Sequence, residues 1–214
     1  MTKSKIDYSV YVLTNMKLAG ESTISGVVKL AIDGGATVIQ YREKEASTGV
    51  MINEALAIQA VTKAAGVPLI INDRIDVALA IDADGVHVGQ SDMPAILARK
   101  LIGPNKILGV SARTPEQVAS AIAGGADYLG IGDIFGTTTK KGTVVIGLEK
   151  FKQLVELSSV PVVGIGGVTK DNATGVIESG ADGIAVISAV FGKDDPENET
   201  RRLMEIIKKA KIIK

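Results

Sequence analysis

Gly124-Gly125-Ala126-Asp127-Tyr128 is the stretch that decides the fold, because similar small residues recur along the chain before runs rich in Val and Ile. Related stretches are Gly34-Gly35-Ala36-Thr37-Val38, Ala83-Asp84-Gly85-Val86 and Gly180-Ala181-Asp182-Gly183-Ile184. A turn that is reused between a helix and a strand indicates repeated βα units. We interpret Asp84, Asp127 and Asp182 as structural residues, since they come where strands begin.

Short runs rich in Val and Ile alternate with longer segments of helical periodicity, which is typical of parallel strands joined by helices. The predicted strands are residues 9–15, 37–44, 68–73, 85–89, 106–112, 128–135, 161–167 and 183–190. This is the number that a closed (β/α)₈ barrel, or TIM barrel, requires. We therefore expect an α/β fold in which residues 1–214 form a single (β/α)₈-barrel catalytic domain.

The connecting segments carry helix signals at their ends. Residues 48–66, 94–103 and 116–125 have apolar side chains at helical spacing. Thr114-Pro115-Glu116 offers an N-cap followed by proline in the first turn, and the glycines at 124 and 125 allow the positive φ that often follows a helix.

Composition limits the classes of partner and location. Lys and Arg total 24 and Asp and Glu total 24, so no global charge favours nucleic acid or a membrane surface as a partner. The chain has no Cys, which excludes disulfides and thiolate chemistry. No signal-peptide core follows Met1, and the apolar runs are shorter than the roughly 20 residues of a membrane span. We expect a soluble, cytoplasmic protein; a homo-oligomer is compatible with the sequence.

Polar residues gather where the predicted strands end, which is where a (β/α)₈ barrel carries its active site. Gln40, Arg42 and Lys44 would point to the same side of an extended strand and would suit a phosphate or diphosphate. The alternative is a solvated strand end in which Glu43 is the partner of these cations. Ser111 ends the fifth predicted strand.

Asp73 and Asp92 end neighbouring predicted strands. Two carboxylates beside a phosphate cluster predict Mg²⁺, which prefers oxygen ligands and takes others from water and phosphate. The alternative is that each aspartate caps the helix that follows it. Among cationic strand ends, the metal interpretation is favoured.

Three further features bear on the site. Residues 163–168 followed by Asn172 predict a strand, a glycine turn and a helix start, where barrels often bind phosphate, and Gly167 would allow close approach. Lys140 follows three threonines on a long loop, which is either a lid that contacts phosphate or a surface loop. His87, the one histidine, is interpreted as a hydrogen-bonded barrel residue, and a zinc site is not expected.

These strand ends resemble the thiamine phosphate synthase family over about residues 8–190. The motifs that carry the resemblance are Val38-Ile39-Gln40-Tyr41-Arg42-Glu43-Lys44, Leu69-Ile70-Ile71-Asn72-Asp73-Arg74, Gly85-Val86-His87-Val88-Gly89-Gln90-Ser91-Asp92, Gly109-Val110-Ser111, Thr137-Thr138-Thr139-Lys140, Gly164-Ile165-Gly166-Gly167 and Ile187-Ser188. The family commonly has prolines after the glycine and before the threonine run, and this chain departs from that pattern with Gly132-Asp133-Ile134-Phe135-Gly136.

The resemblance implies a transferase that joins hydroxymethylpyrimidine pyrophosphate to hydroxyethylthiazole phosphate. Pyrophosphate would leave first, and the thiazole nitrogen would capture the pyrimidine cation. The implied binding residues are Gln40, Tyr41, Arg42, Glu43, Lys44, Asn72, Ser111 and Lys140 for the pyrimidine substrate, Thr137, Thr138, Thr139, Gly167, Ile187 and Ser188 for the thiazole substrate, and Asp73 and Asp92 for Mg²⁺. Of these, Lys140, Arg42 and Ser111 would be catalytic. The alternatives are a related thiazole tautomerase and a non-catalytic sensor of a phosphate ligand.

Overall fold

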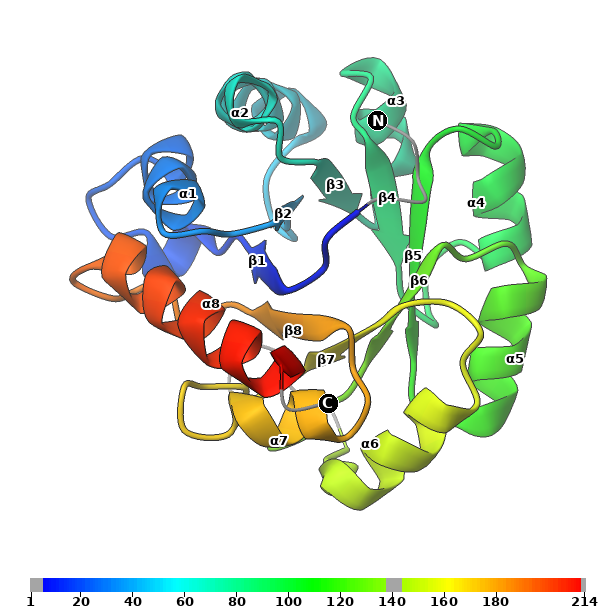
Figure 1. Ribbon diagram of the computed structural model, residues 1–214. Coiled ribbons are helices and arrows are strands. Elements are labelled where there is room, and N and C mark those ends of the chain that lie inside the picture. Colours follow the sequence, from blue (N-terminus) through cyan, green and yellow to red (C-terminus); the bar gives the residue numbers. More distant parts are fainter. Residues whose placement is uncertain (1–5, 138–143, 213–214) are drawn as a thin grey trace.

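Eight parallel strands close into a barrel in chain order in the computed structural model, which describes residues 6–137 and 144–212 (Figure 1). The strands are β1 (Val10–Leu13), β2 (Val38–Tyr41), β3 (Leu69–Asn72), β4 (Gly85–Val88), β5 (Ile107–Ala112), β6 (Tyr128–Ile131), β7 (Val162–Ile165) and β8 (Gly183–Val186). The (β/α)₈-barrel class and all eight predicted strands are confirmed. Each strand is shorter than predicted, by one to four residues.

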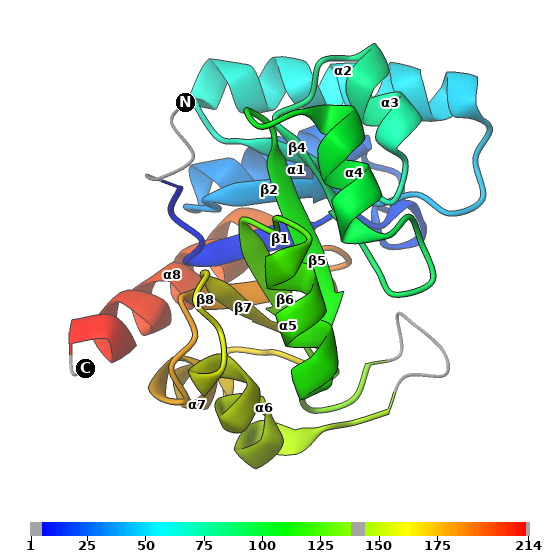
Figure 2. The same ribbon diagram turned by 90° about the vertical axis from the view of Figure 1, so that its right-hand side faces the viewer.

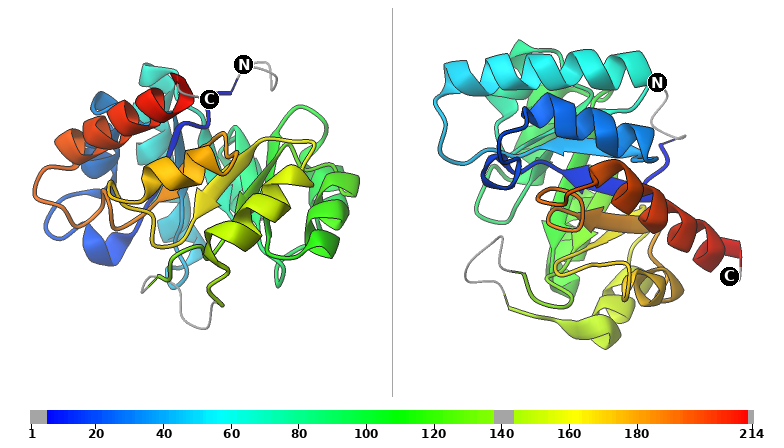
Figure 3. Two further views of the ribbon diagram at one scale, coloured as in Figure 1. Left: turned by 60° about the horizontal axis from the view of Figure 1, so that its bottom comes forward. Right: turned by 90° about the vertical axis from the view of Figure 1, so that its left-hand side faces the viewer.

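Helices form an outer layer around the barrel. They are α1 (Ile24–Asp33), α2 (Thr48–Ala65), α3 (Ile75–Ala80), α4 (Ala95–Ile102), α5 (Pro115–Ala123), α6 (Gly147–Glu156), α7 (Ala173–Glu178) and α8 (Pro196–Ile212), with a 3₁₀ helix at Met16–Leu18. Figure 2 shows α4 and α5 against the side of the barrel that contains β5, and Figure 3 shows α8 lying along α1 and α7. None of the helices within the described residues has the length and apolar character needed to cross a membrane.

The helix ends follow local chemistry. The Thr114 hydroxyl accepts a hydrogen bond from the Gln117 backbone N–H at 3.3 Å, so the predicted start of α5 is confirmed. Gly66 ends α2 in the left-handed conformation with a φ of 68°, which a residue without Cβ adopts at little cost.

Side chains of each strand alternate between two apolar regions. On β1, Val10 and Val12 pack toward the helices, whereas Tyr11 and Leu13 point into the barrel interior. Burial on both faces explains why the strands read as nearly continuous apolar runs. The interior is filled toward the amino ends of the strands, and space for a ligand is left at their carboxyl ends.

A side chain before each even-numbered strand accepts the backbone N–H of the preceding odd-numbered strand. These four turn contacts, with their N···O distances, are Thr37 with Val10 (3.1 Å), Asp84 with Leu69 (2.8 Å), Asp127 with Leu108 (2.7 Å) and Asp182 with Val162 (2.8 Å). The accepting residues belong to the repeated turn, so the structural interpretation of its three aspartates is confirmed. The repeat therefore exists because a short side chain with an oxygen acceptor is needed before each even-numbered strand.

Candidate functional site

A cavity of about 160 Å³ opens at the carboxyl ends of the strands, and every strand contributes to its wall. The residues of the predicted site that line it are Gln40, Arg42, Asn72, Ser111, Thr137, Gly167, Ile187 and Ser188. Thr138, Thr139 and Lys140 lie outside the described residues. Side chains separated by more than 140 positions along the chain thus share one space, as the barrel topology requires.

The cationic side of the site begins where β2 ends. Because the strand stops at Tyr41, strand alternation accounts for Gln40 and Arg42 on the cavity wall but does not extend to Lys44. Lys44 reaches the site from the following loop, and its ammonium pairs with the Asp73 carboxylate. The prediction that one extended strand presents all three side chains is therefore wrong for Lys44.

Tyr41 and Glu43 have partners away from the cavity. The Tyr41 hydroxyl donates to Glu54 Oε2 at 2.6 Å on the helix side of β2. Glu43 Oε1 accepts the backbone N–H groups of Lys44 and Glu45 at 2.7 and 2.6 Å. Burial acts to raise the pKa of Glu43, but these and a further backbone N–H outweigh it, and the pKa is lowered. The two side chains thus hold the loop that carries the cations.

Asp73 and Asp92 come together after β3 and β4. The residue that caps α3 is Arg74 and the residue that caps α4 is Pro94, so the alternative that the aspartates cap these helices is wrong. Asp73 has a φ of 60°, an uncommon conformation for a residue with a side chain, and such conformations gather at functional sites. Asp92 Oδ2 accepts the Gly89 N–H at 2.8 Å.

The Asp92 carboxyl affects the pKa of Asp73. Burial is the largest effect on Asp73 and raises its pKa; the hydrogen bond from the Lys44 ammonium opposes this rise, and the Asp92 carboxyl adds to it. A carboxyl group whose pKa is raised by a neighbouring carboxyl is stabilised in its charged form when a cation lies between the two. The pair is therefore suited to a metal ion.

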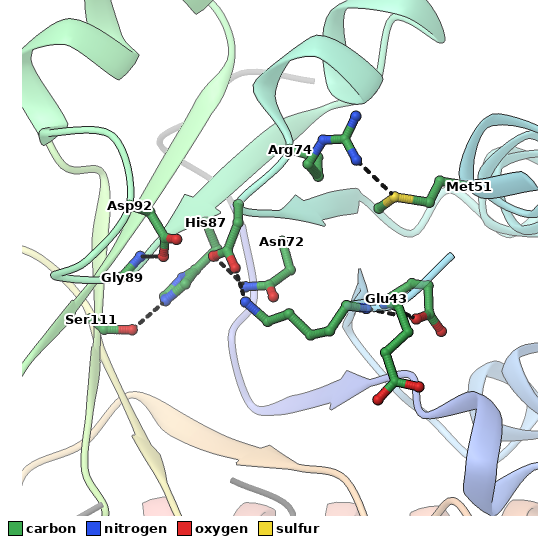
Figure 4. A network of polar contacts seen from close by, with 11 residues as sticks. Glu43, Met51, Asn72, Arg74, His87, Gly89, Asp92 and Ser111 are labelled. Carbon is green, nitrogen blue, oxygen red and sulfur yellow. Dashed lines mark hydrogen bonds and ion pairs between the residues drawn. The ribbon is translucent and has the colours of Figure 1, made fainter. Parts of the chain in front are cut away.

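The surrounding atoms suit a hard divalent cation. Asn72 Nδ2 donates to Asp73 Oδ1 at 3.0 Å, and Asn72 Oδ1 is a buried oxygen without a hydrogen-bond partner among the described residues. No cluster of three or more His, Cys, Asp or Glu side chains gathers within residues 6–137 and 144–212. Most ligands of a cation here would thus come from water and substrate, which is how proteins usually bind Mg²⁺. Figure 4 shows Asn72 and Asp92 facing this space, while Arg74 points away toward Met51.

Two glycine-rich loops form the opposite wall. A Cβ on Gly166 would lie 2.0 Å from Asp133 Oδ1, and a Cβ on Gly167 would lie 2.3 Å from the Gly136 carbonyl oxygen. Asn172 Nδ2 donates to the Gly167 carbonyl at 3.0 Å. The described close neighbour of Gly167 is the loop after β6, and the close approach of a phosphate to Gly167 stays a prediction. The backbone of Gly167 also lines the cavity, so a ligand can reach it.

A hydrogen-bonded chain of residues that line the cavity crosses the barrel interior, and sequence reasoning missed its tyrosines. Gln40 Nε2 donates to the Tyr11 hydroxyl at 2.8 Å, and the Tyr11 and Tyr128 hydroxyls share a hydrogen bond of 2.6 Å. His87 Nδ1 lies 2.9 Å from the Tyr128 hydroxyl, and His87 Nε2 lies 2.9 Å from Ser111 Oγ. The hydrogen-bonded role predicted for His87 is confirmed. The sequence did offer one indication: Tyr11 lies between Val10 and Val12, so a strand would place its side chain on the opposite face from theirs.

Arg113 is a second missed residue. Its side chain lines the cavity, and its Nε donates to the Gly132 carbonyl at 2.9 Å. It comes two residues after Ser111 on the strand pattern, so the same alternation that places Gln40 and Arg42 together could have identified it.

Comparison with known proteins shows which proteins this chain is similar to. The model of the thiamine monophosphate synthase family matches residues 10–190. The thiamine-phosphate synthase of Chloroflexus aurantiacus is 52% identical over 203 residues, which cover 94% of this chain and 94% of that protein. The thiamine-phosphate synthase of a Roseiflexus species is 50% identical over 202 residues, covering 94% of this chain and 86% of that protein.

The solved structures agree as well. The thiamine phosphate pyrophosphorylase of Pyrococcus furiosus superposes with a TM-score of 0.88 and 42% identity, covering 96% of this chain and 98% of that chain. A family match over most of the barrel and a close structural match both include the strands that build the cavity. This chain belongs to the thiamine monophosphate synthase family.

Proposed function

We propose that this chain is a thiamine phosphate synthase, in which residues 1–214 act as one catalytic domain. It joins hydroxymethylpyrimidine pyrophosphate to hydroxyethylthiazole phosphate and releases pyrophosphate. The observation that carries the proposal is the meeting of Arg42, Asn72 and Ser111 on one cavity wall beside the Asp73–Asp92 pair. A thiazole tautomerase would have no use for this cationic, metal-binding half.

The diphosphate would be bound by the Arg42 guanidinium and the Lys44 ammonium, with Lys140 as a further cation expected from the sequence motif. Asp73 and Asp92 would hold Mg²⁺, and Asn72 orients Asp73 through its Nδ2 donation. A bound Mg²⁺ would neutralise charge on the diphosphate oxygens. Lys44, whose ammonium pairs with the Asp73 carboxylate, would contribute a positive charge to the phosphate bound beside that carboxylate.

The bond that breaks joins the pyrimidine methylene carbon to the bridging oxygen, and its electron pair leaves with pyrophosphate. Fixed cations next to that oxygen stabilise the growing negative charge, and such preorganised stabilisation is often the largest contribution to catalysis. The new bond forms from the thiazole nitrogen lone pair to the methylene carbon. No protein nucleophile is needed. The apolar side chains Leu13, Val163 and Ile165 on the cavity wall would help to keep water away from the pyrimidine cation that is left when pyrophosphate departs.

The thiazole phosphate would occupy the side formed by the loops after β6, β7 and β8. Backbone N–H groups near Gly167 and Ser188, together with Thr137 to Thr139, would bind its phosphate. This places the two substrates on opposite walls of one cavity, with the reacting atoms between them. Both partners are thus small molecules.

The test mixes purified protein with both substrates and Mg²⁺ and follows thiamine phosphate and pyrophosphate together, with and without chelator. We expect equal amounts of both products and loss of both with chelator. The variant Arg42→Met should lower kcat by about 10²-fold. Lys29→Met is the matched control, because Lys29 pairs with Asp33 on the surface of α1. A folded protein that binds thiazole phosphate but forms no product would overturn the proposal in favour of the tautomerase or the sensor.

A further inference from the structure

In the hydrogen-bonded chain from Gln40 to Ser111, each group donates to the next in one order. This order decides which hydrogen-bonding groups the site offers to the substrate of the proposed reaction. Tyr11 is 1% exposed, Tyr128 is 0% exposed and His87 is 8% exposed, so water does not compete for their hydrogen bonds. Burial is the main cause that raises the pKa of both Tyr11 and Tyr128. Each phenol therefore keeps its one proton at neutral pH and must donate it somewhere.

The proton of Tyr11 has one available acceptor. The Tyr11 oxygen already receives a hydrogen bond from Gln40 Nε2, and its other hydrogen-bond partner within the described residues is the Tyr128 oxygen. If Tyr128 donated to Tyr11 instead, the Tyr11 proton would be buried without an acceptor, which is unfavourable. Tyr11 therefore donates to Tyr128.

The remaining steps follow from one proton per group. Tyr128 receives the Tyr11 proton and so donates its own to His87 Nδ1, which fixes Nδ1 as the unprotonated nitrogen of the imidazole. The proton of His87 is then on Nε2, which donates to Ser111 Oγ. Figure 4 shows this last contact at the edge of the site. Because Ser111 Oγ accepts from His87, its own proton can be donated to a bound ligand.

Gln40 is at the other end of the chain. Its Nε2 is used by Tyr11, and its Oε1 has no hydrogen-bond partner within the described residues, although Gln40 lines the cavity. The wall thus offers an acceptor at Gln40 and a donor at Ser111. An aminopyrimidine ring offers the complementary pattern, with amino N–H donors beside ring-nitrogen acceptors. A ring that carries an oxo group in place of the amino group has the opposite pattern.

We propose that Tyr11, Tyr128 and His87 are positioning residues that fix the Ser111 hydroxyl as a donor and the Gln40 carbonyl as an acceptor toward an aminopyrimidine. This inference rests on the proposed function for the identity of the ring, but the direction of the chain is a property of the protein alone. The relay sets the hydrogen-bonding roles of two side chains on different strands, Gln40 on β2 and Ser111 on β5, so that one substrate pattern is accepted and its inverse is rejected.

The single histidine makes the direction measurable. Protein labelled with ¹⁵N-histidine at pH 8, above the ordinary histidine pKa of about 6.5, should give one pair of ring-nitrogen signals, with Nε2 protonated and Nδ1 unprotonated. The opposite tautomer in the unmodified protein would overturn the proposal. This measurement needs no turnover, so it is separate from the assay of the synthase reaction, whose failure would leave the tautomer result intact.

Two variants test the mechanism of the relay. Gln40→Glu places an acceptor next to the Tyr11 proton, so the chain should reverse and His87 should move to the Nδ1-protonated tautomer. Tyr128→Phe removes the donor to His87, so the Nε2-protonated form should lose its dominance, and KM for the pyrimidine substrate should rise about tenfold while KM for the thiazole substrate is unchanged. Unchanged tautomer populations in both variants would refute the relay.

Tyr8→Phe is the matched control. The ring of Tyr8 packs against that of Tyr128 with centroids 4.8 Å apart, but its hydroxyl is outside the chain. This variant should keep the wild-type tautomer and both KM values. A shift equal to that of Tyr128→Phe would mean that packing, rather than the hydrogen bonds, sets the tautomer, and would overturn the proposal.

Discussion

Replacing Asp182 with Ala should destabilise the protein without impairing its chemistry. Asp182 Oδ2 accepts the backbone N–H of Val162 at 2.8 Å, and Val162 is 1% exposed, so water cannot take the place of the lost acceptor. A buried N–H left without an acceptor lowers the free energy of unfolding by about 2 kcal/mol. In a chain of 214 residues this corresponds to a fall in Tm of about 4–8 °C.

Thermal unfolding followed by circular dichroism, together with steady-state kinetics at 25 °C, measures both parts of this prediction. Asp127→Ala should lower Tm further, because Asp127 also pairs with Arg99 at 2.5 Å. Asp194→Ala is the control: Asp194 is exposed, and its loss should change the free energy of unfolding by less than about 0.5 kcal/mol. All three folded variants should keep kcat within about twofold, since the turn contacts lie at the end of the barrel away from the cavity.

Two results would refute this reasoning. An unchanged Tm for Asp182→Ala would mean that the turn contact does not stabilise the barrel. A stably folded Asp182→Ala protein with kcat lowered tenfold would mean that the amino ends of the strands are coupled to the chemistry.

Three further predictions concern the site and the tyrosines. Asp92→Ala should lower kcat by about 10²-fold at limiting Mg²⁺ while thiazole phosphate still binds in equilibrium dialysis; normal turnover under those conditions would exclude Asp92 as a metal ligand. Gly166→Ala should weaken thiazole phosphate binding and lower Tm, because the new Cβ would lie 2.0 Å from Asp133 Oδ1, whereas Gly49→Ala, which has open space in α2, should be neutral or slightly stabilising. All 4 tyrosines have raised pKa values, mainly through burial. Above pH 10 the folded state therefore binds more protons than the unfolded state. The free energy of unfolding must then fall as pH rises, by up to about 5 kcal/mol per pH unit. Absorbance at 295 nm should therefore show tyrosinate only together with loss of the circular dichroism signal, and gradual ionisation of a folded protein would contradict this.

The barrel could be predicted from sequence because its determinants are local. The repeated turn at Asp84, Asp127 and Asp182 marks where strands begin, and strand ends in such a fold must converge. Gln40 and Arg42 were found together because the two-residue period of a strand decides which side chains share a face.

Other features depend on contacts that no local pattern encodes. Both faces of these strands are buried, so an apolar run does not reveal which face is inside, and tyrosines occur on either side: Tyr11 points into the barrel and Tyr41 points toward the helices. The end of β2 at Tyr41 depends on pairing with its neighbours, which is why Lys44 was placed on the strand. Asp73 has a positive φ, but aspartate is also a common helix cap, so the residue type alone does not distinguish the two roles.

The turn contacts divide the barrel into quarters, because they join β1 to β2, β3 to β4, β5 to β6 and β7 to β8. Lys211 Nζ on α8 donates to Ser9 Oγ at 2.7 Å, so the end of the last helix lies next to the residue that precedes β1. A circularly permuted chain opened between α2 and β3 would keep every quarter whole, whereas one opened between α1 and β2 would split a quarter across its new ends. The order of the strands along the chain is thus not fixed by the turn contacts. A permuted chain could begin at any of the four quarter boundaries, and each pair of strands would still be joined by its own turn contact within one continuous segment.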